Sequence, residues 1–155
     1  MRDDLRDLYQ SVILEHARAP HNFHRLEDAS LSAHGDNPMC GDQLTVFLRL
    51  DDGVIAEAGF IGHGCAIALA SASLMTDLLR GRSAARAEQL FAALETMCGT
   101  NHPDEVDVPE QDRAAVDQLR VLSGVRAFPV RIRCATLAWH TMRAALHGKS
   151  HASSE

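Results

Sequence analysis

A thiol and a carboxylate lie two residues apart in one short turn of this chain, and both groups can bind a metal. The turn runs from Asn37 to Asp42 with the sequence NPMCGD, and Pro38 and Gly41 bend its backbone around Cys40. Zinc accepts thiolate sulfur together with carboxylate oxygen, so Cys40 and Asp42 can supply half of a tetrahedral site. Because turns of Asn, Pro, Gly and Asp are also ordinary loops, the hypothesis depends on where further ligands lie.

The residues after this turn predict a β-hairpin. Apolar side chains recur at every second position over residues 44–50 and again over residues 54–60, as expected for two strands with one buried face. The stretch Asp51-Asp52-Gly53 separates them, and its glycine suits a three-residue turn. The sequence therefore predicts two antiparallel strands that lead away from the Cys40 turn and return to it.

The pairing of this hairpin brings a second cysteine to the turn. If Leu50 faces Val54, antiparallel pairing keeps the two residue numbers of each pair summing to about 104. Asp42 then lies near residue 62 and Cys40 near residue 64, and a single bulge would shift this register by one residue. Cys65 is therefore expected beside the turn, as a third metal ligand.

Cys65 also stands at the predicted start of a helix. Small residues dominate the stretch from Ala66 to Met75, and the apolar stripe of this helix ends before Gly81. The positive end of a helix dipole lowers the pKa of a thiol and favours the thiolate that binds metal. His63 is a candidate fourth ligand, but the direction of its side chain depends on a register defined only to within one residue.

Four further helices are predicted around the hairpin. They cover residues 3–18, residues 83–97 with Ser83 as the cap, a stretch from Pro109 to about residue 122, and a last helix that begins at Pro129. Residues 20–36, with three histidines, and residues 99–111 are expected to be irregular surface segments. Cys98 continues the apolar stripe of its helix, so we interpret it as a core residue rather than a ligand.

Cys134 lies in the early turns of the last predicted helix, beside two arginines. The local sequence pattern does not predict that Cys134 lies close to the hairpin. Three thiolates and one carboxylate around a divalent cation would leave about two negative charges. Arg131 precedes Cys134 by three residues and shares its helix face, where we expect it to compensate that charge or to attract an anionic or persulfide group. The alternative is a solvated arginine beside a buried thiol.

Length and charge narrow the classes of protein to consider. At 155 residues, with 46% hydrophobic and 23% charged residues, the chain is expected to form one domain over residues 1–155, with a flexible tail from about residue 148. A net charge of −6 argues against a nucleic-acid partner, and no apolar run reaches membrane-spanning length. The charged N-terminus predicts a cytoplasmic protein, in which four cysteines serve metal or sulfur chemistry.

Four separated blocks of the sequence resemble the IscU/SufU family, the NifU N-terminal-like iron–sulfur cluster assembly proteins. They are LYQ with ILEH in residues 8–16, NPMCGD in residues 37–42, residues 62–73 and residues 128–139. The resemblance implies an α+β fold, in which a small antiparallel sheet of about three strands packs against several helices. The family's metal ligands carry over onto Cys40, Asp42, Cys65 and Cys134, where we expect about one zinc ion per chain.

Two features resemble the SufU branch of that family. Arg133 stands where IscU-type members have histidine, and the segment between Cys65 and Cys134 is long. The branch implies a zinc-dependent sulfurtransferase that accepts persulfide sulfur from a SufS-type pyridoxal-phosphate cysteine desulfurase and serves downstream iron–sulfur assembly proteins. In that role we expect Cys40 to accept the sulfur, Asp42 to ease exchange of metal ligands, and Arg131 to meet the charge of the site.

Two alternatives stay open. One is an iron–sulfur cluster assembly scaffold that holds a transient cluster, for which the missing histidine removes one candidate ligand. The other is a structural zinc module without transfer chemistry. Asp42 argues against that module, because structural zinc sites usually consist of cysteine and histidine.

Overall fold

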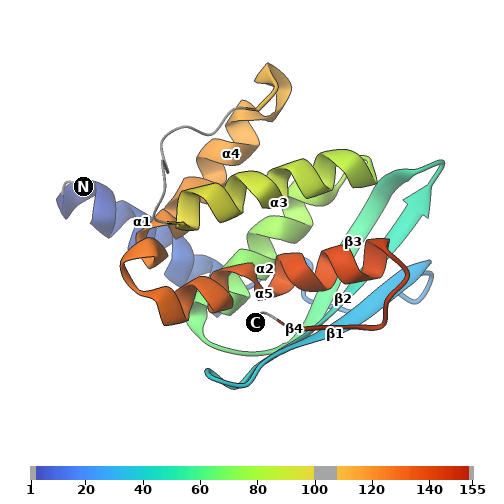
Figure 1. The fold of residues 1–155 in the computed structure, drawn as a ribbon, viewed down its shortest axis with the longest axis horizontal. Helices are drawn as coiled ribbons and strands as arrows, with labels where there is room; N and C mark the ends of the chain where they lie inside the picture. Colours follow the sequence, from blue (N-terminus) through green and yellow to red (C-terminus); the bar gives the residue numbers. More distant parts are fainter. Residues whose placement is uncertain (1–2, 100–107, 154–155) are drawn as a thin grey trace.

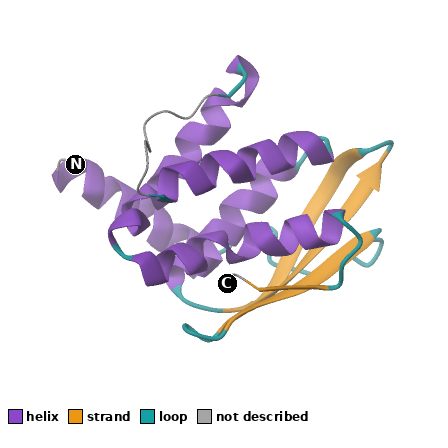
Figure 2. Ribbon diagram, in the orientation of Figure 1, coloured by secondary structure: helices purple, strands orange, loops and turns teal. Residues whose placement is uncertain are grey.

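The computed structural model describes residues 3–99 and 108–153, in which helices gather on one face of a β-sheet (Figures 1 and 2). The α+β fold that the sequence predicts is therefore confirmed. In chain order the elements are α1 (Asp3–Arg18), β1 (Leu31–Asn37), β2 (Asp42–Asp51), β3 (Val54–His63), α2 (Ala66–Leu79), α3 (Ala84–Cys98), the 3-10 helix η1 (Glu110–Asp112), α4 (Arg113–Leu119), the 3-10 helix η2 (Arg120–Ala127), α5 (Pro129–Leu146) and β4 (His151–Ser153).

The sheet has four strands in the order β3-β2-β1-β4. Antiparallel pairing joins β1 to β2 and β2 to β3, whereas β4 runs parallel to β1. The expected sheet of about three antiparallel strands corresponds to β1, β2 and β3, and the fourth strand makes the sheet mixed. Helix α5 packs over β1 and β2, and α2 packs against β3 and α5 (Figure 1).

Two strands lie where the sequence predicts none. β1 occupies the end of the stretch 20–36, which was expected to be irregular, and β4 lies in the stretch expected to be a tail. The last three residues of β1, Gly-Asp-Asn, have low β-propensity, but β2 pairs with β1 along its whole length. Non-local pairing thus overrides local preference. His34 is consequently a strand residue, hydrogen-bonded to Thr45 Oγ1 at 3.0 Å, rather than a solvated loop residue.

The hairpin of β2 and β3 forms as predicted, but its turn is shorter. The turn consists of Asp52 and Gly53, whose φ angles of 51° and 78° fit a two-residue turn of type I′. Paired residue numbers sum to 105 next to the turn and to 106 beyond a bulge after Arg49, so the expected sum of 104 is wrong by one to two. The corrected register brings Asp42 level with residue 64, closer to Cys65 than expected.

Helices α2 and α5 are fixed to each other by a buried pair of hydrogen bonds. Trp139 of α5 is fully buried, and its Nε1 donates to Ser71 Oγ of α2 at 3.1 Å. Ser71 Oγ in turn donates to the Ala135 carbonyl oxygen at 2.5 Å. Because α2 follows Cys65 directly and α5 carries Cys134, this contact sets the relative positions of two proposed ligands.

Several predicted helix ends and the position of Cys98 are also confirmed. Ser83 caps α3 by accepting a hydrogen bond from the backbone N–H of Arg86 at 3.2 Å, and α5 begins at Pro129. Cys98 is fully buried in the core. Most of the predicted irregular segment 99–111 lies outside the described residues. No helix in the described ranges is long and apolar enough to cross a membrane.

Candidate metal centre

Three segments that are distant in the sequence meet at one end of the sheet. They are the turn between β1 and β2, the junction of β3 with α2, and the early part of α5 (Figure 1). The structure brings the metal-binding atoms of Cys40, Asp42 and Cys134 within 4.8 Å of one another. It thus places Cys134, which local pattern could not position, beside the turn that the sequence analysis singled out.

The two sulfur atoms of this group differ sharply in their surroundings. Cys40 Sγ lies 3.2 Å from Cys134 Sγ, a contact between two free thiols. Cys134 is buried, whereas Cys40 is exposed in the turn. Two thiolates bound to one tetrahedral zinc ion lie about 3.8 Å apart, given Zn–S bonds of about 2.3 Å. A small increase in the distance between the two sulfurs would therefore bring them to the spacing that zinc requires.

Asp42 is a buried carboxylate held by two neutral donors. Its side chain is 1% exposed. Oδ1 accepts the backbone N–H of Cys65 at 2.9 Å, and Oδ2 accepts the side-chain amide of Asn37 at 3.1 Å. Among the described residues no Lys, Arg or His forms an ion pair with Asp42. An ionised carboxylate is costly to bury without a countercharge, so the donor set fits a bound cation.

Asn37 is the residue of this site that sequence reasoning missed. It is 1% exposed, and its Nδ2 donates both to Asp42 and, at 3.5 Å, to Cys134 Sγ. Asn37 is the last residue of β1 and pairs with Asp42, the first residue of β2. It could have been noticed as the opening residue of the NPMCGD turn, but its inward direction follows from the unpredicted strand β1.

Cys65 is partly buried and forms the N-cap of α2, close to the predicted helix start. Its backbone N–H fixes Asp42, as described above. Its thiol lies outside the group of atoms within 4.8 Å of one another, but close enough to Cys134 to raise the pKa of that thiol. The structure therefore places Cys65 next to the other three residues, at the position from which it can complete a four-ligand set.

The pKa of Cys134 is raised far above its ordinary value. Burial is the largest cause, followed by the hydrogen bond to Cys40 and by the proximity of Cys65 and Asp42. Each of these influences disfavours a second negative charge in the same small volume. Cys134 would thus ionise only when a cation compensates the charge, as a divalent metal does.

Comparison with known proteins identifies the family. The NifU-like N terminal domain family matches residues 8–118. The zinc-dependent sulfurtransferase SufU of Bacillus subtilis is 34% identical, covering 90% of this chain and 89% of that protein. The iron–sulfur cluster assembly scaffold protein IscU of Thermotoga maritima is 32% identical, covering 90% and 92%. The chain belongs to the NifU-like N-terminal domain family.

A solved structure supports the same assignment. A putative iron–sulfur cluster assembly scaffold protein for the SUF system, from Fervidobacterium islandicum AW-1, superposes with a TM-score of 0.75 at 26% identity. The alignment covers 87% of this chain and 93% of that one. The family resemblance and the fold are therefore confirmed. The relatives carry both the SufU and the IscU name at similar identity, so identity alone does not distinguish a sulfurtransferase from a scaffold.

Within this family site, His63 lies apart from the group. It is exposed and pairs with Gln43, one position along β2 from Asp42. Since successive side chains of a strand point to opposite faces, His63 lies on the face opposite to Asp42. The structure thus gives no support to His63 as the fourth ligand.

Arg131 is near the site in sequence but is not directed at the thiols. It is exposed, and its guanidinium carbon lies 5.6 Å from the centre of the Phe128 ring. Arg131 lines a hollow of about 530 Å³ bounded by α1, α2, η2 and the start of α5. In the described part of the chain its side chain has no hydrogen bond or ion pair with the cysteines. This arrangement matches the alternative of a solvated arginine beside a buried thiol.

Proposed function

We propose that this protein is a zinc-dependent sulfur acceptor in iron–sulfur cluster assembly, which takes persulfide sulfur from a SufS-type pyridoxal-phosphate cysteine desulfurase. One observation carries the proposal: the exposed thiol of Cys40 lies 3.2 Å from the buried thiol of Cys134. A partner can therefore reach the sulfur of Cys40 while that of Cys134 stays enclosed. We further propose that the protein works in the cytoplasm and passes the sulfur to downstream assembly proteins.

The proposed ligands of one zinc ion are Cys40, Asp42, Cys65 and Cys134. Zinc, when bound, would keep the ligating sulfurs deprotonated at neutral pH. The protein holds some of these proposed ligands in place more firmly than others. Asn37 and the backbone N–H of Cys65 hold Asp42, and Asn37 also holds Cys134. Cys40 lies in an exposed turn, so it is the ligand most easily released.

The proposed transfer is thiol–disulfide exchange at a persulfide. The Cys40 thiolate attacks the outer sulfur of the persulfide on the desulfurase cysteine. The sulfur–sulfur bond of that persulfide breaks, a new sulfur–sulfur bond forms on Cys40, and the desulfurase cysteine leaves as a thiolate. Gly41, with φ of +72° and nothing within 4 Å of a hypothetical Cβ, gives the turn room to present Cys40 to a partner.

Arg131 is proposed to act on the partner rather than on the metal. Its exposed guanidinium can attract an anionic or persulfide group that approaches along α5. Arg131→Ala is expected to retain zinc and to weaken stimulation of the desulfurase. Loss of zinc from this variant would instead assign Arg131 to the metal centre.

Tandem mass spectrometry after reaction with a SufS-type desulfurase and cysteine tests the proposal. The zinc-loaded protein should carry an extra sulfur on Cys40, and Cys40→Ser should carry none while still binding the desulfurase. Cys98→Ala, which changes a buried cysteine outside the site, is the matched control and should accept sulfur normally. Extra sulfur on Cys65 or Cys134 would overturn Cys40 as acceptor but not sulfur transfer itself.

An iron–sulfur scaffold is the second candidate function, because the IscU relatives are named as scaffolds. Anaerobic reconstitution with iron and sulfide would then give a stable visible cluster, with no persulfide on any cysteine. Exposed Arg133 in the position directly before Cys134 offers no neutral ring nitrogen to a cluster, so we favour sulfur transfer. A structural zinc module would show neither outcome, and would lose stability rather than activity when zinc is removed.

A further inference from the structure

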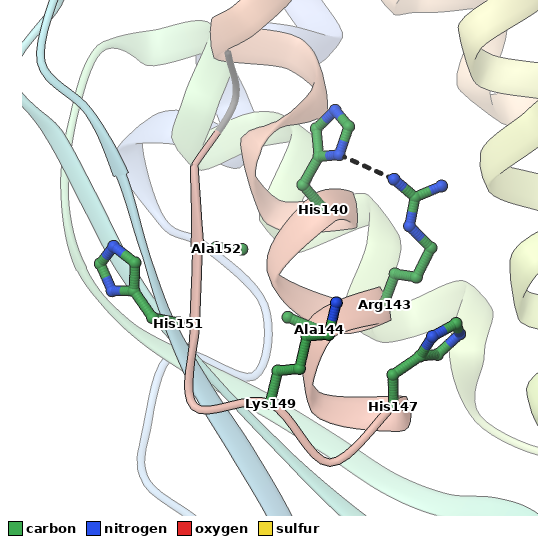
Figure 3. Close-up of a pocket in the computed structure, with 7 residues that line it drawn as sticks. All are labelled: His140, Arg143, Ala144, His147, Lys149, His151 and Ala152. Atoms are coloured by element: carbon green, nitrogen blue, oxygen red, sulfur yellow. Dashed lines mark hydrogen bonds between the residues drawn. The ribbon is translucent and has the colours of Figure 1, made fainter.

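A basic hollow lies at the far end of α5 from the metal centre, where the chain turns back toward β4 (Figure 3). Arg143 follows Cys134 by nine residues, which is roughly 14 Å along the helix at 1.5 Å per residue. The hollow has a volume of about 200 Å³. None of the lining residues carries a carboxylate; they are His140, Arg143, Ala144, His147, Lys149, His151 and Ala152.

Arg143 presents a fixed guanidinium to this hollow. Its guanidinium carbon lies 4.8 Å from the centre of the Phe91 ring, and Nη2 lies 3.2 Å from His140 Nδ1 (Figure 3). The pKa of His140 is lowered by burial and then by Arg143, so the neutral ring accepts this hydrogen bond. Within the part of the chain that the structure describes, Arg143 has no carboxylate partner. Its remaining N–H donors are free to meet a ligand.

The position of Lys149 is fixed by the end of α5. Gly148, with φ of +72°, donates its backbone N–H to Ala145 O at 3.0 Å, and Lys149 donates its own to Ala144 O at 2.8 Å. These are the two hydrogen bonds of a Schellman motif, which satisfies carbonyls at the helix end. Figure 3 shows the Lys149 side chain running back along the last turn, next to Ala144. In the described ranges Lys149 forms no ion pair with Asp or Glu.

The other two histidines are already paired with acids. His147 Nε2 lies 3.0 Å from Glu88 Oε1, and His151 Nε2 lies 3.2 Å from Asp36 Oδ2. In Figure 3 the His151 ring points away from the side chains of α5. The two uncompensated charges at the hollow are therefore the guanidinium of Arg143 and the ammonium of Lys149, in a chain whose net charge is −6.

We propose that this hollow binds a phosphate group between Arg143 and Lys149. A guanidinium held against an aromatic ring and hydrogen-bonded to His140 has restricted freedom, which suits recognition of an oxyanion. Two cations on separate segments match a multiply charged tetrahedral anion better than a single carboxylate. The volume is below the range of pockets for drug-sized ligands, so the group bound is small, either free phosphate or a small phosphate ester.

Basic residues in the last turn of a helix also stabilise the negative end of its dipole. Here the carbonyls of that turn already accept backbone N–H groups from His147, Gly148 and Lys149. The side chains of Arg143 and Lys149 are therefore not needed to satisfy those carbonyls. Both side chains line the hollow and can meet a ligand there.

Titration of the zinc-loaded, 15N-labelled protein with inorganic phosphate, pyrophosphate, glycerol 3-phosphate and acetate tests this site by NMR. Saturable shifts are expected for the amides of residues 143–149 with the phosphate compounds, and no saturation with acetate. Comparing inorganic phosphate with glycerol 3-phosphate shows whether the site prefers free phosphate or a small phosphate ester. Arg143→Gln and Lys149→Gln should each weaken binding about tenfold or more, as for loss of one charge-assisted hydrogen bond.

The matched control is Arg113→Gln, an exposed arginine paired with Glu110 elsewhere on the surface, which should bind phosphate normally. The proposal is overturned if no phosphate compound gives saturable shifts, if both lysine and arginine variants bind as the parent does, or if acetate saturates equally well. Lys149→Gln alters an exposed side chain, so it tests the site even if Arg143→Gln folds poorly. Unchanged zinc content in each variant shows that any loss of phosphate binding does not result from loss of zinc.

Discussion

One buried amide connects two of the proposed metal ligands. Asn37 Nδ2 donates to Asp42 Oδ2 at 3.1 Å and to Cys134 Sγ at 3.5 Å. Cys40 is tied to Asn37 only through its backbone N–H, which donates to the Asn37 carbonyl at 3.2 Å and leaves the thiol exposed. Hydrogen bonds from outside a metal site orient the ligands and tune their affinity. At the scale of single residues, Asn37 therefore holds two of the four proposed ligands, Asp42 and Cys134, whereas the proposed ligand Cys40 is exposed and can leave.

Asn37→Ala is expected to weaken zinc binding about 10–100-fold, because residues that orient metal ligands typically contribute this much. It should also cost about 1–3 kcal/mol of stability, since a buried carboxylate loses a donor. Competition with a zinc chelator measures the first effect and urea unfolding the second. Asn22→Ala is the control, because Asn22 donates to Thr76 and Asp77 away from the site. Equal losses of zinc affinity in both variants would contradict a positioning role for Asn37.

The thiol of Cys98 has a raised pKa, mainly because it is buried. Burial is the largest cause that raises its pKa to about 12, from 9.0. The folded state therefore keeps the proton while the unfolded state loses it above pH 9, so the stability contributed by this group is complete below pH 9 and is lost as the pH rises toward 12. Cys98→Ala should cost about 1 kcal/mol at pH 7 and show a shallower alkaline decline. Urea unfolding across this pH range measures both, and an unchanged decline would contradict the assignment.

At the scale of elements, the sequence predicted those parts of the fold that local pattern specifies. Alternation revealed β2 and β3, and the small-residue stretch after Cys65 revealed α2. The register was wrong because the two-residue turn and the bulge were not foreseen. The error left Cys65 beside the turn, because beyond the bulge the paired sum shifts by two, which preserves the residues that share a face. Next to the hairpin turn the sum shifts by one, so Ile55 is buried and Val54 is exposed.

The elements that sequence reasoning missed depend on distant partners. β1 ends in Gly-Asp-Asn and has little strand preference of its own, so its pairing with β2 decides its structure. The same limit applies to Cys134, whose place at the site depends on how α5 packs on the sheet. Family resemblance supplied Cys134 where spacing could not. It did not supply Asn37, whose role becomes visible only from hydrogen bonds in the folded protein.

The packing of α5 on β1 depends on one glycine. A Cβ on Gly35 would lie 2.0 Å from Thr141 Oγ1 and 3.2 Å from Leu137 Cδ1, both on α5. Gly35→Ala should therefore destabilise the fold by about 1–3 kcal/mol, as for overpacking of a core. Adding Thr141→Ala should recover part of that loss, because the closest atom is removed. Urea unfolding of both single variants and the double variant tests this coupling, and simple additivity of the two changes would contradict it.

At the scale of the whole molecule, the metal centre joins segments that the chain brings together only when folded. Cys40 and Cys134 are 94 residues apart in sequence, and Cys65 lies between them at the start of another helix. An unfolded chain cannot hold these groups in one place, so a metal bound by them would stabilise the folded state by mass action. Removal of zinc should consequently lower the melting temperature and release the constraint between the turn and α5.

Zinc removal should also make Cys40 and Cys134 the preferred pair for a disulfide, because their sulfurs are already 3.2 Å apart. Treatment of the zinc-free protein with diamide, followed by peptide mapping, should find this bond and not one to Cys98. A cross-link across so long a loop typically stabilises a protein by about 2–4 kcal/mol, by limiting the unfolded chain. The oxidised zinc-free protein should therefore melt above the reduced zinc-free protein.

Two controls make this last prediction specific to the metal centre. The zinc-loaded protein should resist diamide, since metal-bound sulfurs are not free to pair, and Cys40→Ser should form no such bond. Cys98→Ala should form the bond normally because Cys98 lies in the core, outside the group around Cys40. A bond between Cys65 and Cys134 in place of the expected one would show that Cys40 moves away from Cys134 once the metal leaves. The turn would then be organised by zinc rather than by the fold that surrounds it.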